Sequence, residues 1–219
     1  MNNKNIVEKI YTDAGNFSIL KLINGQKLRI LDVGCGSGDN AKLLKLLGHR
    51  VDGITISDVE ADIVKNIVEN VYIFNLENGL PELSGNYDII LCSHVIEHIV
   101  YPEKLMLDIK RLCNHGAQLV VALPNLMNYK SRIEILKGNF EYKESGIWDF
   151  THVKWYTFLS AKKLLTKYGF EIVYEGVEGD LPFSRFLFFL PKKVKRFLIK
   201  ILIFISKGLF GSQLIFKAK

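Results

Sequence analysis

Short apolar runs alternate with segments of helical periodicity along most of this chain. The runs are bounded by glycine, proline or polar residues and have the length of buried strands. They predict strands at 30–33, 50–56, 71–74, 87–92, 117–123 and 170–175, with a further strand at 211–219. Strands that alternate with helices are typical of an α/β fold, in which helices cover both faces of a parallel sheet.

The segments between the runs predict the helices. Apolar residues recur every three or four positions at 6–23 (with a break near Gly15), 39–47, 58–66, 102–113, 128–137 and 160–169. Ser57 and Ser160 are suited to the N-cap position, and Pro102 is tolerated in a first helical turn because it needs no N–H donor there.

The first predicted strand runs directly into a glycine turn, in the sequence RILDVGCGSGDN at 29–40. Gly34, Gly36 and Gly38 indicate a backbone that must approach another group closely. A dinucleotide-binding fingerprint requires its third glycine at the position of Asp39. Because a carboxylate there would repel a pyrophosphate, the turn disfavours a dinucleotide.

This segment resembles motif I of the class I S-adenosylmethionine (SAM)-dependent methyltransferases, in which an acid and a glycine turn hold the methionine part of the cofactor. The matching positions are Asp32, Gly34, Gly36 and Gly38. The resemblance implies SAM as cofactor and a single methyltransferase domain over 1–219. It also implies a Rossmann-like seven-stranded sheet, mostly parallel, with an antiparallel last strand.

The resemblance implies further cofactor contacts at the ends of the next strands. Thr55 stands where relatives place an acid that accepts hydrogen bonds from the ribose hydroxyls, which is a departure from their pattern. The other implied contacts are Ile56 beside it, Asn75 and Leu76 at the adenine, Ser93 after the fourth strand, and Tyr11 from a helical cover at 1–28. A surface or core role for Tyr11 and a turn role for Asn75 remain alternatives.

The fourth predicted strand is followed by HVIEH, which matches the zinc-protease signature H-x-x-E-H at His94, Glu97 and His98. A protease needs this signature inside a long helix, whereas here it lies between a strand and Pro102. The segment also resembles the strand-four motif of ubiquinone-type O-methyltransferases, some of which bind a divalent cation with an acid at the position of His94. The changed residue leads us to expect a metal-free site.

A second group of polar residues occurs at 149–152 and resembles the D-x-T-H segment of bacterial small-molecule methyltransferases. A histidine whose second nitrogen is held by Asp149 is suited to act as a general base, so His152 and His98 are both candidates. The alternative is structural, with Asp149 capping a turn and His152 packing beneath it. The surrounding region 126–160 is predicted to form a lid, in which Trp148 and Trp155 shape an acceptor pocket.

Charged residues are distributed unevenly along the chain. Residues 181–219 carry nine Lys or Arg and no Asp or Glu, which leaves a net charge of −3 on the first 180 residues. The insertion at 181–210 predicts a basic amphipathic helix, interrupted by lysines too often to span a bilayer. Such a helix suits an anionic membrane surface, and packing against the body or a second subunit is the alternative.

The residues and the resemblance together predict a SAM-dependent methyltransferase that acts on a hydroxyl of a small molecule, a sugar or a lipid-linked glycan. A quinone or phenol O-methyltransferase and a non-catalytic SAM-binding protein are the alternatives. The acidic body argues against a nucleic-acid substrate. Three scattered cysteines and the absence of an apolar leader lead us to expect a cytoplasmic protein, which the basic insertion could attach to the inner face of the membrane. The sequence does not predict the oligomeric state.

Overall fold

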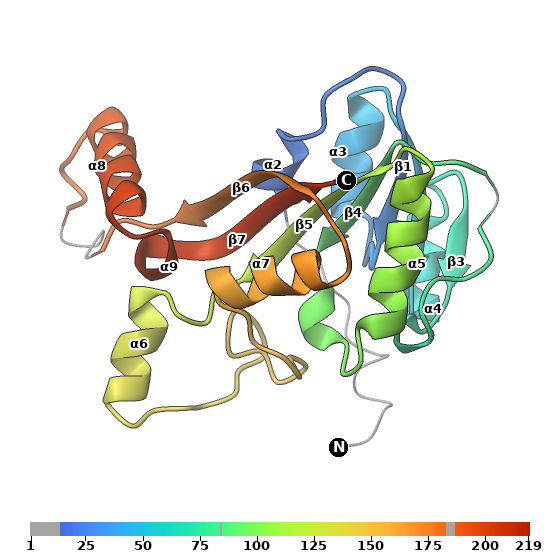
Figure 1. Ribbon diagram of the computed structural model, residues 1–219. Helices are drawn as coiled ribbons and strands as arrows, with labels where there is room; N and C mark the ends of the chain where they lie inside the picture. Colours follow the sequence, from blue (N-terminus) through green and yellow to red (C-terminus); the bar gives the residue numbers. More distant parts are fainter. Residues whose placement is uncertain (1–13, 84, 183–186) are drawn as a thin grey trace.

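The computed structural model describes residues 14–83, 85–182 and 187–219 and contains one mixed β-sheet between two layers of helices (Figure 1). The expected cofactor contact Tyr11 lies outside the described residues. Of the helical cover expected at 1–28, the described part contains one short helix, α2, Phe17–Leu20.

The sheet has seven strands in the order β3-β2-β1-β4-β5-β7-β6. Strand β7 runs opposite to the other six strands of this sheet, and it lies between β5 and β6. The strands are β1 Arg29–Val33, β2 Arg50–Thr55, β3 Val71–Ile73, β4 Ile89–Ser93, β5 Gln118–Pro124, β6 Ile172–Gly179 and β7 Gly211–Ala218. The predicted Rossmann-like fold with an antiparallel last strand is therefore confirmed.

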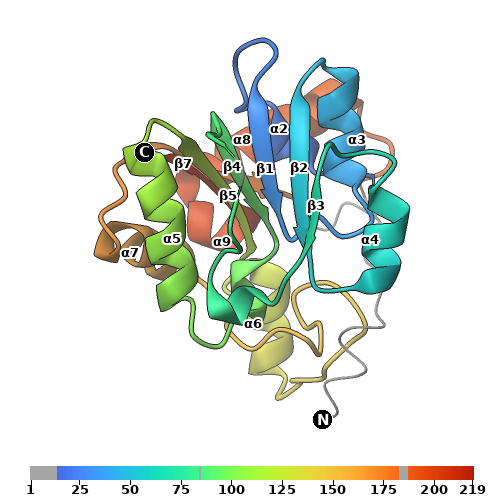
Figure 2. The same cartoon turned by 90° about the vertical axis from the view of Figure 1, so that its right-hand side faces the viewer.

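Helices cover both faces of the sheet (Figure 2). Helices α2, α3 Asp39–Leu46 and α4 Asp58–Val64 contribute to one apolar core, in which Leu44 and Val64 pack on Ile30 and Val51. Helices α5 Glu103–Asn114 and α7 Phe158–Lys167 contribute to the other. The remaining elements are the 3₁₀ turns η1 Leu76–Asn78 and η2 Ile96–His98, and helices α6 Tyr129–Leu136, α8 Lys192–Ile205 and α9 Lys207–Phe210.

One helix begins where it was predicted to begin, and another begins earlier. Helix α3 begins directly after Gly38, whose left-handed backbone (φ 87°) serves as the N-cap. Helix α7 begins two residues before Ser160, because Thr157 and Ser160 form a reciprocal capping box. The predicted cap at Ser57 is confirmed, since its side chain accepts a hydrogen bond from the backbone N–H of Glu60 at 3.3 Å.

A buried carboxylate joins the beginnings of four strands. Asp52 of β2 is 1% exposed and accepts hydrogen bonds from Arg29 at the start of β1 (2.9 Å) and from the Tyr87 hydroxyl before β4 (2.8 Å). The Asn70 side chain, before β3, donates a further bond of 2.9 Å. Burial alone would raise the pKa of Asp52, but these hydrogen bonds outweigh it and lower the pKa below its usual value.

We predict that Asp52→Asn lowers the free energy of unfolding by about 2 kcal/mol, since it weakens hydrogen bonds to a buried charge. Because the folded-state pKa lies below the unfolded one, this carboxylate stabilises the protein above the unfolded pKa. That contribution is lost as the pH falls through the folded pKa. Urea unfolding at a series of pH values below about 4 should therefore show a weaker pH dependence for Asp52→Asn than for the wild type.

The control is Glu69→Gln, whose carboxylate pairs with Arg50 at 2.9 Å on the surface. It should change the unfolding free energy by less than about 1 kcal/mol. Equal destabilisation by the two substitutions would contradict the role assigned to Asp52.

Candidate active site at the carboxyl edge of the sheet

The parallel strands end at one edge of the sheet, and the predicted site residues are distributed along this edge. Gly34, Gly36 and Gly38 follow β1 with φ values of 71°, 52° and 87°, a left-handed region that side chains disfavour. A Cβ added to Gly34 would lie 2.6 Å from Val95 Cγ2, and one added to Gly38 would lie 2.6 Å from Val64 Cγ2. The turn thus requires glycine, for its conformation and for space, and it fits a ligand held by backbone groups.

The carboxylate that the sequence lacks at position 55 is supplied in space by another residue. Thr55 is buried at the end of β2, and its hydroxyl donates a hydrogen bond of 2.6 Å to Glu60 Oε2. The backbone N–H of Ser57 donates to the same hydroxyl at 3.2 Å. Sequence reasoning missed Glu60, which is 4% exposed in the first turn of α4. The cap at Ser57 was the available signal, because it folds this turn back over the strand end.

The other implied cofactor contacts occupy the same edge. Ile56 is 40% exposed beyond β2, whereas Leu76 is buried in η1. The Asn75 side chain accepts a hydrogen bond of 3.0 Å from the Glu77 N–H, so it caps η1, in agreement with the turn role left open for it. Asp32 lies inside β1 and is 1% exposed.

Ser93, the last residue of β4, belongs to a polar network that extends to β7. The Asn16 side chain donates to the Ser93 hydroxyl at 3.2 Å and to Gln213 Oε1 at 3.0 Å. His94 Nε2 lies 2.7 Å from the same Gln213 oxygen. This network borders a hollow of about 270 Å³ that is also lined by Glu178.

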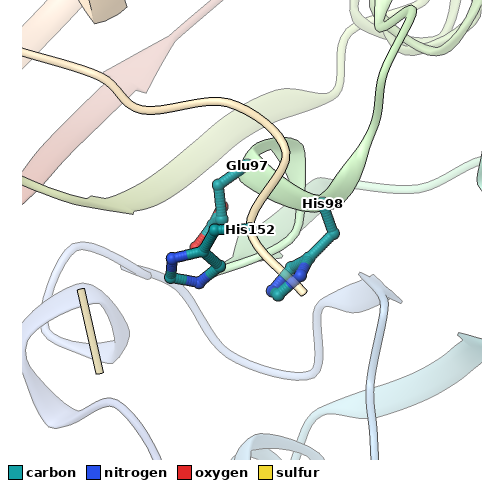
Figure 3. Close-up of side chains that lie close together, drawn as sticks. All are labelled: Glu97, His98 and His152. Atoms are coloured by element: carbon teal, nitrogen blue, oxygen red, sulfur yellow. The ribbon is translucent and has the colours of Figure 1, made fainter. Parts of the chain in front are cut away.

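Two distant segments meet beside η2. The backbone N–H groups of Val153 and Lys154 both donate to the carbonyl of Glu97 at 3.0 Å. This contact places the 149–152 segment against the end of the HVIEH segment. The rings of His98 and His152 then lie edge to face, with centroids 4.7 Å apart (Figure 3).

Each ring is oriented by a bond to its Nδ1. His152 Nδ1 lies 3.0 Å from the Ile147 carbonyl oxygen, and His98 Nδ1 lies 3.2 Å from that of Thr151. Because a carbonyl only accepts hydrogen bonds, Nδ1 carries the proton in both rings. In a neutral imidazole this leaves Nε2 as the proton acceptor.

Asp149 is linked to His98, one of the two histidines that were candidates for this contact. The Nδ1 atom of the other candidate, His152, lies against the Ile147 carbonyl. The Thr151 hydroxyl donates to Asp149 Oδ1 at 2.6 Å and lies 3.1 Å from His98 Nδ1. Asp149 is therefore linked through Thr151 to His98, because the intervening turn brings the threonine between them.

Glu97 is fully buried behind these rings, and its Oε1 lies 3.2 Å from His94 Nδ1. Burial alone would raise the pKa of Glu97, but the His94 hydrogen bond and the charges of His94 and His98 hold it below its usual value. For His98, burial lowers the pKa; the nearby Glu97 carboxylate opposes this effect without cancelling it. Glu97 is thus ionised and His98 neutral near neutral pH.

The same three side chains form a possible metal-ligand set. One ligand atom each of Glu97, His98 and His152 lies within 4.8 Å of the others. Among the described residues, no hydrogen-bond partner is in reach of Glu97 Oε2. His94 contacts Glu97 through Nδ1 and Gln213 through Nε2, and it is not a member of this ligand set. The expectation of a metal-free site stays a prediction.

Aromatic side chains of the predicted lid pack beside His152. The ring of Phe140 contacts Trp148 and Trp155, with centroid distances of 4.6 and 5.8 Å. Trp155 Nε1 donates at 3.3 Å to the Ile147 carbonyl that also holds His152. Trp148 is 9% exposed, whereas Phe140 and Tyr142 are about half exposed, so the cluster presents part of its aromatic surface to solvent.

The chain resembles known proteins in sequence and in fold. It is similar to the ubiquinone biosynthesis O-methyltransferase of Rickettsia prowazekii, with 34% identity over 134 residues that cover 56% of this chain and 46% of the relative. The protein of the same name from Coxiella burnetii (strain Dugway 5J108-111) is 26% identical over 146 residues, covering 58% and 62% of the two chains. The matched region thus spans about half to three-fifths of these relatives.

Solved structures share the fold. A SAM-dependent methyltransferase from Archaeoglobus fulgidus superposes with a TM-score of 0.60 and 22% identity, covering 91% of this chain and 89% of that one. Magnesium protoporphyrin IX methyltransferase from Synechocystis PCC 6803, solved with bound SAH, has a TM-score of 0.54 and 18% identity, covering 91% and 78%.

The sequence also matches the family described as "Methyltransferase domain" over residues 9–175, most of the chain. This match extends from before the glycine turn to β6 and includes both histidine segments. The chain therefore belongs to the class I SAM-dependent methyltransferases, and S-adenosylmethionine is its cofactor.

Proposed function

We propose that this protein transfers a methyl group from SAM to a hydroxyl of a small molecule, a sugar or a lipid-linked glycan. The observation that carries the proposal is the pair of histidines at 98 and 152, with both rings oriented through Nδ1 at the carboxyl edge of the sheet. A hydroxyl must lose its proton as it attacks, so a positioned neutral imidazole is the group that such a reaction requires.

His98 is the better placed of the two as the base. It is partly exposed, whereas His152 is 7% exposed and packs against it. A proton taken up at His98 Nε2 creates an imidazolium whose charge is stabilised by Glu97 and, through Thr151, by Asp149. His152 orients the ring and excludes water beside it.

SAM supplies an electrophilic methyl group, and the chain supplies its position. The glycine turn and Asp32 are suited to hold the methionine part. We assign Glu60, supported by Thr55, to the ribose hydroxyls, because a carboxylate can accept two hydrogen bonds from a diol. Leu76 and Asn75 remain our assignment for the adenine. Alignment of the methyl group with the attacking oxygen provides much of the lowering of the barrier.

Two observations bear on the acceptor. The hollow beside His94 is lined by amide and carboxylate groups, which suit an acceptor that carries several hydroxyls. The aromatic cluster beside Trp155 instead favours a phenol or quinone acceptor, the second candidate, as do the names of the Rickettsia and Coxiella relatives. A methyl-transfer assay on polyols, sugars and phenols separates these classes, and turnover of none of them would favour a SAM-binding protein without catalysis.

We predict that His98→Ala lowers kcat by about a hundredfold or more and leaves the affinity for SAM unchanged, because the base acts on the acceptor proton. In the wild type, the rate should fall only at pH values below 6.5, since the pKa of His98 lies below that ordinary value. Steady-state kinetics across pH and calorimetry with SAM measure the two effects.

The control is His115→Ala, an exposed histidine at the end of α5, which should retain full turnover. If His98→Ala keeps full turnover and His152→Ala loses it, the base is His152 and the assignment to His98 is wrong. Activity should also persist after a chelator is added. Loss of activity that a divalent cation restores would show that the histidines bind a metal and would refute the metal-free mechanism.

We further predict that Glu60→Gln weakens SAM binding about tenfold or more, because charge-assisted hydrogen bonds to the ribose are lost. The matched control is Asp62→Asn on the same helix, whose side chain is 75% exposed. Calorimetry with SAM and with its demethylated product measures the change, and thermal unfolding verifies that both variants fold. Wild-type affinity in Glu60→Gln would exclude the ribose contact.

A further inference from the structure

The insertion between β6 and β7 is attached at the edge that carries the candidate site. Strand β6 ends at Gly179 and β7 begins at Gly211, and these two residues are paired. Next to them, Gln213 of β7 pairs with Pro124 at the end of β5. Figure 1 shows α8 and α9 at the end of the sheet from which the chain also continues from β5 into α6.

This attachment is held by specific contacts. The buried side chain of Asn125, directly after β5, donates hydrogen bonds to the carbonyls of Gly208 at 2.9 Å and Gly211 at 2.6 Å. At Gly179, an added Cβ would lie 2.2 Å from the Phe210 carbonyl oxygen and 3.4 Å from the tip of Ile203. The insertion is therefore packed against the strand ends and fixed to them.

Helix α8 presents three different faces. Its partly buried face packs toward the body, and a second face is apolar and exposed. The members of the packed face are Leu198, Ile199, Leu202 and Ile203. Those of the exposed apolar face are Val194, Phe197, Ile201, Phe204 and Ile205. A third face, adjacent to the exposed apolar one at 3.6 residues per turn, consists of Lys192, Lys193, Arg196 and Lys200.

The exposed apolar face is large. Phe204 is 92% exposed, Ile205 67% and Phe197 63%. The turn before the helix adds Phe188 and Phe189, which are 79% and 67% exposed. The Lys195 ammonium bonds the Phe188 carbonyl at 3.3 Å, which holds this turn against the start of α8. Exposed apolar patches of this kind mark interaction surfaces.

The charges beside the exposed apolar face of α8 indicate which partner binds it. The segment 181–219 carries no acid, and the basic face borders the apolar one directly. In a symmetric pair of chains joined through the apolar faces, two basic faces would approach each other and repel. An anionic lipid surface accommodates both faces, with apolar side chains among the acyl chains and cations at the phosphates. No described helix is long and apolar enough to cross a membrane, and an interfacial helix need not be.

We propose that the α8 insertion binds the surface of an anionic phospholipid bilayer, with the exposed apolar face of α8 and the Phe188–Phe189 turn embedded in it. The helix lies in the plane of the interface, and its basic face contacts the phosphate groups. The contacts of Asn125 and Gly179 then hold the carboxyl edge of the sheet beside the lipid surface.

The test is co-sedimentation of the full chain with vesicles. One set contains phosphatidylcholine alone and the other contains phosphatidylcholine with phosphatidylglycerol. The chain should sediment with the anionic vesicles, and a much smaller fraction of it should sediment with the neutral ones. Added salt should weaken the binding to the anionic vesicles. Sedimentation requires neither SAM nor an acceptor, so its outcome is separate from that of the methyl-transfer assays.

Two double variants separate the faces. Phe197→Ser with Phe204→Ser should weaken binding about tenfold or more, because two apolar side chains no longer enter the bilayer. Arg196→Gln with Lys200→Gln should weaken it about fivefold for each charge removed. The control for the phenylalanine variant is Leu46→Ser with Leu47→Ser, which changes two apolar residues at the end of α3 that are 84% and 64% exposed. The control for the charge variant is Lys27→Gln with Lys163→Gln, which changes two exposed lysines elsewhere on the surface. Both controls should bind as the wild type does.

Three results would overturn the proposal. These are equal binding to neutral and anionic vesicles, wild-type binding by the Phe197→Ser, Phe204→Ser variant, or no binding at all. Sedimentation equilibrium without lipid gives a further check. A wild-type dimer that the phenylalanine variant converts to a monomer would show that a second copy covers this face, and this too would refute bilayer binding.

Discussion

The carbonyl of Glu97 is the point on which the candidate site depends. It accepts hydrogen bonds from the backbone of Val153 and Lys154, and so joins two segments more than fifty residues apart in sequence. Without this contact, His98 and His152 would belong to separate loops. The side chain of the same residue lies buried behind both rings, so one residue fixes the backbone geometry and supplies the negative charge that an imidazolium requires.

The fold was largely predictable because its signals are local. Each buried strand is a short apolar run, and the parallel order follows from the helices between the strands. The requirement for glycine at position 34 was also visible, although the neighbour that imposes it, Val95, was not. The start of α7 differed from the prediction because it is decided by hydrogen bonds within one helical turn, which several candidate caps can form equally well.

The polar contacts were less predictable, because each depends on which side chain the fold brings nearest. The Glu60 carboxylate lies against the Thr55 hydroxyl because α4 returns over the end of β2. Asp149 and His152 are close in sequence, yet the turn between them directs the carboxylate to Thr151 and onward to His98. Asn125 directly follows β5, and its role in holding the insertion arises from residues more than eighty positions later.

The pairing of Gly179 with Gly211 means that the insertion leaves and re-enters the sheet across a single strand spacing. A loop closed at such a short distance costs little more entropy when it lengthens, because the cost grows only with the logarithm of its length. The segment can therefore be exchanged between related enzymes without disturbing β6 or β7. The length and sequence of the insertion can thus vary while the carboxyl edge of the sheet stays the same.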